Sequence, residues 1–320
     1  MIIIANYIMS QESNLIYDLI TILGPTATGK TQLAVHIANH LNGEIISADS
    51  RQVYRGMNIG TGKDLEEYNI NGHKIPCHLI DIVEPMQKYN VSQFQKDFQK
   101  VATDIDNRGK VPIICGGTGF YIKALLMNFQ IPKTEPNKQL RDKLETWNID
   151  ELIRKLESIS PGASEKWPVD TRRRVIRAIE IALSREKGER RLEKGERDGK
   201  EFQNPIIIGI DFPRDEIRKR ITRRLYQRLD DGMIEEVESL LKNGVTPERM
   251  DDLGLEYRFI NSYLQGQIGK NDMIEKLNTA IHQFAKKQMT FFRNMENNGI
   301  NIIWVPQGDF HIALEVILKT

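Results

Sequence analysis

The segment Gly24–Thr31, GPTATGKT, has the residue types and spacing of a phosphate-binding P-loop: glycine, four residues, glycine, lysine, then serine or threonine. Glycines let backbone amides converge on phosphate oxygens, and the N-terminus of a following helix adds a favourable dipole. Lys30 would neutralise phosphate charge, and the Thr31 hydroxyl could ligate Mg²⁺ as cofactor. The motif therefore predicts a diphosphate or nucleotide site formed by Gly24, Pro25, Thr26, Ala27, Thr28, Gly29, Lys30 and Thr31.

The elements around this motif are those that a P-loop requires. Leu19–Leu23 is a short apolar run that predicts a strand, and Gln32–Leu41 carries apolar residues at helical spacing. Further strands and helices are expected in alternation, with strands at Ile45–Ile46, Leu79–Val83 and Val111–Cys115 and helices opening at Ser92 and about Gly119. This alternation predicts a parallel sheet covered on both faces.

The pattern changes after Gln130. The stretch from Leu140 to about Leu183 is helical in character, and the mixed-charge run Arg185–Lys200, in which EKGER occurs twice, is typical of a mobile loop. Pro205–Phe212 predicts a strand that returns the chain to the sheet. Helices are then expected at Arg214 to about Asp230, Met233–Lys242 and about Asp272–Arg293, before a last strand at Asn301–Val305.

The predicted fold class is therefore α/β, a P-loop NTPase-like parallel sheet flanked by helices, with a helical insertion domain and a helix-rich C-terminal part. The expected divisions are a disordered or edge segment (1–14), the core (15–130 and 205–320) and the insertion (131–204).

The composition excludes several classes of protein. The 320 residues include 45 Lys and Arg and 44 Asp and Glu, so any basic surface must come from local clustering. Cys77 and Cys115 are flanked by apolar residues, which favours reduced packing thiols in a cytosolic protein. The opening MIIIANYIM is far shorter than the ~20 residues of a membrane span and lacks the features of a secretory signal, and Met9 could be the start. We expect a cytoplasmic location and no membrane partner.

Several blocks together resemble the tRNA dimethylallyltransferase (IPP transferase) family. They are the P-loop, DSRQVYRGM from Asp49 to Met57, CHLIDIVEP from Cys77 to Pro85, YNVSQF from Tyr89 to Phe94, and VPIICGGTGFYIKALL from Val111 to Leu126. The resemblance runs from about Leu19 to Arg293. It implies an enzyme that transfers a dimethylallyl group from dimethylallyl diphosphate to the exocyclic amine of the adenosine adjacent to the anticodon in tRNA, forming N6-isopentenyladenosine.

The residues make chemical sense of this reaction. A leaving diphosphate must be stabilised, which backbone amides, Lys30 and Mg²⁺ would do, and the attacking amine must lose a proton. The resemblance points to Asp49 as the carboxylate that faces the amine, and a strand's carboxyl end is where ligands of open α/β sheets bind. Thr118 would hydrogen-bond the diphosphate. Alternatively, Asp49 caps a helix or assists Mg²⁺ indirectly, and Thr118 is a plain helix cap.

Two arginines offer a clamp for the diphosphate. Arg220 and Arg224 lie one helical turn apart and so on one helix face. The alternative is a solvated basic face.

The expected tRNA contacts fall in four places. A basic cluster in TRRRVIRAIE suits backbone phosphates. The resemblance implies contacts by Arg173, Arg174 and Arg177 in this cluster, by Asp49, Ser50, Arg51 and Gln52 around the adenine, by Tyr257 and Arg258, and by Gln288 as a base reader. The open alternative is that the arginines pair with glutamates such as Glu180. Phe291 and Phe292, beside basic residues, could form a base platform, but we expect them to belong to the core.

Two departures from the family pattern fall on these segments. Glu256 stands where the family commonly has glycine, and His282 where it commonly has arginine. A paralogue with altered tRNA preference therefore stays open.

Three other functions share some of these features: a small-molecule or nucleotide kinase with the same P-loop, a nucleotide- or RNA-binding protein without chemistry, and a prenyltransferase acting on free nucleotide. The arginine cluster disfavours the last. No stable protein partner is implied, so a monomer is expected.

Overall fold

The computed structural model describes residues 16–129, 132, 134–186 and 202–318. The N-terminal segment 1–14 and most of the mixed-charge run Arg185–Lys200 lie outside the described residues. The chain divides into two compact units, Met1–Phe129 with Gly199–Thr320, and Gln130–Asp198. The sequence placed the insertion at 131–204.

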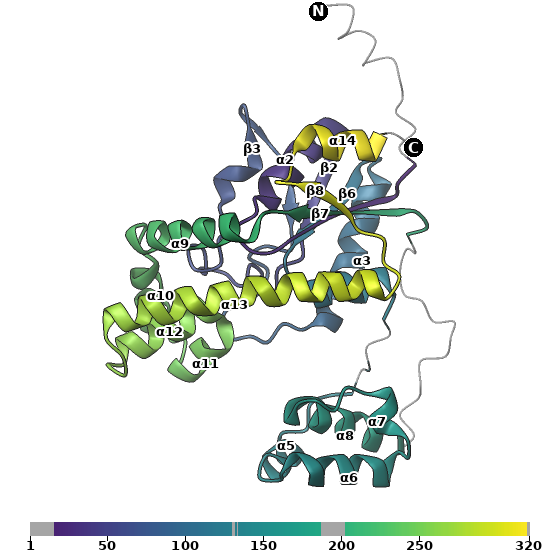
Figure 1. The fold of residues 1–320 in the computed structure, drawn as a ribbon, viewed down its shortest axis with the longest axis vertical. Coiled ribbons are helices and arrows are strands. Elements are labelled where there is room, and N and C mark those ends of the chain that lie inside the picture. Colours follow the sequence, from purple (N-terminus) through teal and green to yellow (C-terminus); the bar gives the residue numbers. More distant parts are fainter. Residues whose placement is uncertain (1–15, 130–131, 133, 187–201, 319–320) are drawn as a thin grey trace, which may run out of the picture. The chain divides into compact units, whose positions relative to one another are not determined.

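The larger unit is built on a six-stranded parallel sheet in the order β5-β2-β6-β1-β7-β8 (Figure 1). The strands are β1 (Leu19–Leu23), β2 (Gly43–Ser47), β5 (Cys77–His78), β6 (Val111–Gly116), β7 (Pro205–Asp211) and β8 (Ile303–Pro306). All of their pairings are parallel. A separate antiparallel pair joins β3 (Asn69–Ile70) and β4 (His73–Lys74). Strands from before and after the insertion share one sheet, which confirms the predicted P-loop NTPase-like α/β fold.

Helices surround the sheet and form most of the rest of the chain. Those preceding the insertion are α2 (Lys30–Leu41), the 3₁₀ turn η1 (Leu65–Tyr68), α3 (Val91–Asn107) and α4 (Gly119–Leu126). Those following it are α9 (Arg214–Asp230), α10 (Met233–Lys242), α11 (Pro247–Leu253), α12 (Leu255–Leu264), α13 (Lys270–Asn297) and α14 (Phe310–Leu318). The inserted unit contains α5 (Lys138–Leu144), α6 (Ile149–Ile159), α7 (Ala163–Lys166) and α8 (Arg172–Glu186) around its own apolar core.

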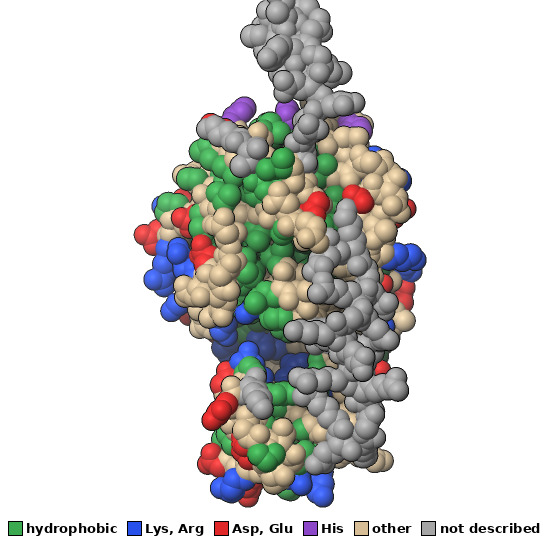
Figure 2. All heavy atoms as spheres, turned by 90° about the vertical axis from the view of Figure 1, so that its right-hand side faces the viewer, with side chains coloured by type: hydrophobic (Ala, Val, Ile, Leu, Met, Phe, Trp, Pro, Cys, Tyr) green, Lys and Arg blue, Asp and Glu red, His purple; other side chains and the backbone are tan. Residues whose placement is uncertain are grey.

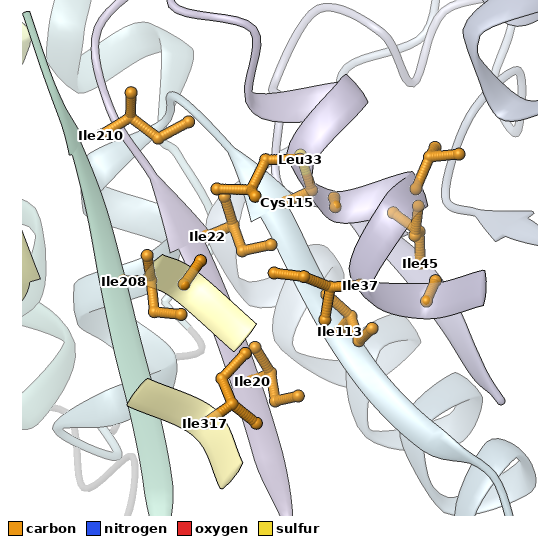
Figure 3. Close-up of a cluster of buried hydrophobic side chains, with 14 of the residues drawn as sticks. Ile20, Ile22, Leu33, Ile37, Ile45, Ile113, Cys115, Ile208, Ile210 and Ile317 are labelled. Atoms are coloured by element: carbon orange, nitrogen blue, oxygen red, sulfur yellow. The ribbon is translucent and has the colours of Figure 1, made fainter. Parts of the chain in front are cut away.

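Alternate residues of each central strand pack on opposite faces of the sheet. In β1, Ile20 and Ile22 join a buried cluster with Leu33 and Ile37 of α2 (Figure 3). Leu19 and Leu23 join a second cluster with side chains of α3, α4 and α13. Because both faces are covered, the strands are continuous apolar runs.

Three features differ from the sequence prediction. Leu79–Val83 is not a strand: Leu79 and Asp81 have φ of 62° and 54°. Leu79 is buried, and the other apolar side chains of the segment are partly buried against the core clusters. Helix α3 begins one residue earlier than predicted, because Asn90 forms a capping box with Gln93. The short helices α11, α12 and α14 were not predicted, although Thr246 followed by Pro247 is a helix-start signal.

The structure bears on the expectations drawn from the cysteines, the charged residues and the apolar segments. Cys77 and Cys115 are free thiols, and burial raises the pKa of each to about 12. Acidic and basic side chains both lie along the flanks of the larger unit in the view of Figure 2. Within the described ranges, every helix is too short or too polar to cross a bilayer.

A buried carboxylate collects several hydrogen bonds at the edge of the sheet where the strands begin. Glu44, at the start of β2, has a side chain only 2% exposed. It accepts hydrogen bonds from Arg108, including one of 2.7 Å from Nη2, and from His78 and Lys110 at 2.8 Å each. The bond from Arg108, assisted by the other two, holds the pKa of Glu44 well below its usual range.

Removing this carboxylate should destabilise the protein. Glu44→Ala leaves three clustered cationic or polar groups without their shared acceptor. We expect the free energy of unfolding to fall by about 2–3 kcal/mol, a limited loss because the cations are partly exposed to water. Urea unfolding at pH 7 measures it. Asp104→Ala, which removes the exposed partner of the same Arg108, should cost less than ~1 kcal/mol. Equal losses of unfolding free energy in the two variants would contradict this stabilising role of Glu44.

Candidate functional site

A cavity of about 740 Å³ opens where the parallel strands end. Segments that follow three neighbouring strands line it: 26–32 after β1, 49–52 after β2 and 116–120 after β6. The loop 60–62, the 3₁₀ turn η1 and helices α9, α11, α12 and α13 complete the wall. All of these belong to the larger unit. The arrangement places the cavity at the carboxyl edge of the sheet, where open α/β sheets bind ligands.

The P-loop adopts a compact, internally bonded conformation. Ala27 and Gly29 have φ of 65° and 79°, and α2 begins directly afterwards at Lys30. The Thr28 hydroxyl donates to the Pro25 carbonyl at 2.9 Å, and Lys30 Nζ donates to the same oxygen at 2.8 Å. Thr26 to Thr31 line the cavity, whereas Gly24 packs against Ile210 behind the loop. The cradle thus directs the start of α2 at the cavity.

Helix α9 forms hydrogen bonds to the P-loop from the facing wall of the cavity. Arg220 Nε donates to the Ala27 carbonyl at 2.7 Å, and Arg224 donates to the Thr26 hydroxyl. The alternative of a solvated basic face is therefore wrong for both. Arg228, one turn further along, also lines the cavity and is only 9% exposed. Arg228 was not predicted as a site residue, although its spacing from Arg224 repeats that between Arg220 and Arg224.

Asp49, Ser50 and Thr118 meet across neighbouring strand ends. The Arg51 amide donates to Asp49 Oδ1 at 2.8 Å, and the Ser50 amide donates to Thr118 Oγ1 at 3.0 Å. Among the described residues, no hydrogen bond reaches Asp49 Oδ2. Thr118 occupies the N-cap position of α4 but makes no side-chain cap, so its hydroxyl instead joins the two loops. The half-buried Asp49 is placed to accept a proton inside the cavity.

Two predicted RNA-contacting amides are committed to the protein. Gln288, on α13, accepts from the Thr26 amide and donates to the Gly117 carbonyl, both at 2.9 Å. Gln52 accepts from the Ser47 hydroxyl at 3.0 Å and donates to the Gly62 carbonyl at 2.9 Å. Each side chain therefore positions loops of the cavity in the free protein, and the RNA contacts predicted for Gln288 and Gln52 stay predictions.

The predicted pair Tyr257 and Arg258 divides between core and cavity. Tyr257 is 1% exposed and its hydroxyl donates to Glu236, so its ring is part of the core, and its predicted RNA contact stays a prediction. Arg258 and Arg51 line the cavity. Of the two phenylalanines assigned to the core, Phe292 is fully buried, but Phe291 lines the cavity together with Phe120 and Phe284, which are about half exposed.

The arginine cluster of the inserted unit is only partly available. Arg177 donates to Glu180 at 3.0 Å and to the Thr134 carbonyl at 2.8 Å, as the alternative of pairing with glutamate predicts. Arg174 forms an exposed ion pair with Asp170. Arg173 is exposed. Burial of Glu180 is offset by its bonds from Arg141 and others, which lower its pKa overall.

The electrostatics of the cavity suit an anionic ligand. Burial lowers the pKa of Lys30 to about 8, and the nearby Arg224 adds to the decrease. Burial, with Arg228 close by, also lowers the pKa of Arg224. A diphosphate bound beside Lys30, Arg224 and Arg228 would neutralise part of their positive charge.

The chain matches two models of known protein families. The model of the IPP transferase family matches residues 52–295, and that of isopentenyl transferase matches 17–74. The chain belongs to the IPP transferase family. It is therefore a transferase enzyme.

Curated relatives cover almost the whole chain. The tRNA dimethylallyltransferase 1 of Parabacteroides distasonis is 49% identical over 291 residues, spanning 90% of this chain and 92% of the relative. The tRNA dimethylallyltransferase 2 of Porphyromonas gingivalis W83 is 50% identical over 289 residues, spanning 90% and 93%.

Solved structures agree. The full-length tRNA isopentenylpyrophosphate transferase of Bacillus halodurans has a TM-score of 0.67 and 32% identity, covering 95% of each chain. A eukaryotic dimethylallyltransferase described as acting on tRNA has a TM-score of 0.72 and 26% identity, covering 92% of this chain and 74% of the other.

Of the two departures from the family pattern, one enters the cavity of this IPP transferase. Glu256 lines the cavity at the start of α12, and burial raises the pKa of its carboxyl, partly offset by Arg228 and Arg224. His282 instead lies within 3.3 Å of the Thr222 hydroxyl on α9, and burial lowers its pKa.

The depressed pKa of Lys30 predicts a pH-dependent donor affinity. Below about pH 8 the free protein already carries the charged ammonium; above it, binding of an anion must take up a proton because the anion raises the lysine pKa. The Kd for dimethylallyl thiolodiphosphate, an unreactive donor analogue, should rise up to about tenfold per pH unit above 8.

Titration calorimetry from pH 6.5 to 9.5 measures this dependence. Lys30→Met should bind weakly and lose the dependence between pH 7.5 and 9.5. A wild-type Kd that stays constant from pH 7 to 9 would contradict the assignment.

Proposed function

We propose that the chain transfers a dimethylallyl group from dimethylallyl diphosphate to the exocyclic amine of the adenosine adjacent to the anticodon in tRNA, forming N6-isopentenyladenosine. Relatives that share about half of its residues over nearly their full length carry the name tRNA dimethylallyltransferase. The observation that carries the proposal is that one cavity holds a P-loop, a clamp of arginines and the Asp49 carboxylate together.

The reaction divides between two walls of the cavity. On the P-loop wall, backbone amides, Lys30, Arg220 and Arg224 hold the diphosphate and stabilise its charge as the C1–O bond of the donor breaks and the electron pair leaves with the diphosphate. On the Asp49 wall, the adenine N6 forms its bond to C1 and passes a proton to the carboxylate. Thr118 hydrogen-bonds the Ser50 amide in the free protein and adjoins both walls.

Magnesium is the proposed cofactor. Thr31 lines the cavity at the first turn of α2 and offers a hard oxygen ligand. No group of three or more His, Cys, Asp or Glu side chains among the described residues could hold a metal ion alone. A single hydroxyl ligand from Thr31 fits an ion whose other ligands would be diphosphate oxygens and water. When bound, Mg²⁺ would neutralise diphosphate charge.

The tRNA is proposed to reach the site through residues that remain available in the structure. Arg51, Arg258 and Lys287 line the cavity, and Arg173 is exposed in the inserted unit. Phe120, Phe284 and Phe291 give the cavity apolar surface for a prenyl chain or a base. We propose a monomer, because no feature of the sequence implies a stable protein partner. A cytoplasmic location suits an enzyme acting on tRNA.

A direct assay separates this function from a kinase. The protein is incubated with radiolabelled dimethylallyl diphosphate and Mg²⁺, with tRNA, with AMP or without acceptor. Label should pass to tRNA alone, at the adenosine beside the anticodon. Transfer to AMP, or ATP turnover without transfer to tRNA, would contradict the proposal.

The role of Asp49 is tested by an isosteric change. Asp49→Asn keeps an oxygen for the Arg51 amide but removes the proton acceptor, so transfer should fall about 10²–10⁴-fold while the Kd of the donor analogue stays within twofold. Asp251→Asn, an exposed carboxylate at the rim of the same cavity, serves as matched control and should keep full activity. Equal loss of binding and transfer in Asp49→Asn would assign Asp49 to the metal or the fold.

A further inference from the structure

Glu236 does not line the cavity, yet it holds a loop that does. From helix α10, its Oε2 accepts hydrogen bonds from the amides of Asn58 and Ile59 at 2.7 Å each, and its Oε1 accepts from the Gly60 amide at 3.0 Å. The Tyr257 hydroxyl donates to Oε1 at 2.8 Å. Three successive amides that converge on one anion form a backbone nest, and the carboxylate of Glu236 fills it.

The loop held in this way forms part of the cavity wall. Gly60, Thr61 and Gly62 line the cavity. A Cβ on Gly60 would lie 2.7 Å from the Tyr257 ring, and a Cβ on Gly62 would lie 1.9 Å from the Arg228 guanidinium. The loop is therefore pressed between two side chains of the C-terminal helices and presents bare backbone at two of its three cavity positions.

The loop is tied in turn to the segment that carries Asp49. The Gln52 amide bridges the Gly62 carbonyl at 2.9 Å and the Ser47 hydroxyl at 3.0 Å. Gln52 lies three residues after Asp49, in the same turn. The P-loop is fixed by different contacts, from Arg220, Arg224 and Gln288. Displacing the loop 58–62 should therefore disturb the Asp49 wall and leave the P-loop wall in place.

We propose that Glu236 is a positioning residue for the acceptor side of the reaction, holding the loop 58–62 and, through Gln52, the orientation of Asp49. The inference rests on the proposed transfer to tRNA. Its chemistry requires a carboxylate rather than an amide, because all four partners are donors. A glutamine would turn its own NH₂ group toward a backbone N–H.

The test uses Glu236→Gln in the full-length enzyme, with steady-state transfer to tRNA, calorimetric binding of dimethylallyl thiolodiphosphate and hydrogen exchange of the loop amides. We expect kcat for transfer to fall at least tenfold, the donor analogue Kd to stay within twofold, and exchange at Asn58, Ile59 and Gly60 to accelerate at least tenfold. Glu235→Gln removes the same charge from an exposed neighbour on α10 and is the matched control, expected to match wild type in all three. Glu236→Asp keeps an acceptor anion and should recover part of the loss in kcat.

Three outcomes would overturn the inference. They are wild-type kcat in Glu236→Gln, unchanged amide exchange in that variant, and parallel losses of donor binding and transfer, which would indicate a general role in folding. If Glu236→Gln does not fold, Glu236→Asp carries the test, and a kcat for that variant equal to wild type with accelerated loop exchange would count against positioning. Absence of transfer by the wild-type enzyme would instead contradict the proposed function, while the exchange data would still report whether Glu236 anchors the loop.

Discussion

The structure depends on keeping the backbone of the P-loop open toward one cavity. A loop whose amides must converge on phosphate cannot satisfy all of its polar groups internally, so other elements must hold its shape. Here they come from far along the chain: Arg220 and Arg224 of α9 bond to Ala27 and Thr26, and Gln288 of α13 bonds to the Thr26 amide. The C-terminal helices therefore hold the shape of the P-loop in addition to their part in the fold.

The parallel sheet brings the second half of the site to the same place. Because parallel strands end at one edge, the residues after β2 and β6 lie beside the P-loop, and the Ser50 amide can bond to Thr118. In the proposed reaction, leaving-group stabilisation and proton removal therefore occupy adjacent walls, each with its own anchoring contacts. This separation explains how one compact cavity of a P-loop fold can serve group transfer to a nucleophile other than water.

How much of this could be predicted from the sequence follows from the range of the interactions. The P-loop, the strand-helix alternation and the insertion are local patterns, and family resemblance added Asp49 and Thr118. The hydrogen bonds that Gln52, Gln288 and Tyr257 make within the protein have partners up to 262 residues away in the sequence. Residue type alone therefore did not distinguish a contact to RNA from a hydrogen bond within the protein. The apolar run Leu79–Val83 was read as a strand because burial by loop packing and burial within a sheet produce the same composition.

The most direct measurement of the central claim is a crystal structure of the protein with Mg²⁺ and dimethylallyl thiolodiphosphate. We expect the diphosphate to lie on the amides of Gly29 to Thr31 with Arg220 and Arg224 turned toward it, and C1 of the prenyl group to point to the Asp49 wall. A diphosphate bound away from the P-loop, or a prenyl chain directed away from Asp49, would contradict it.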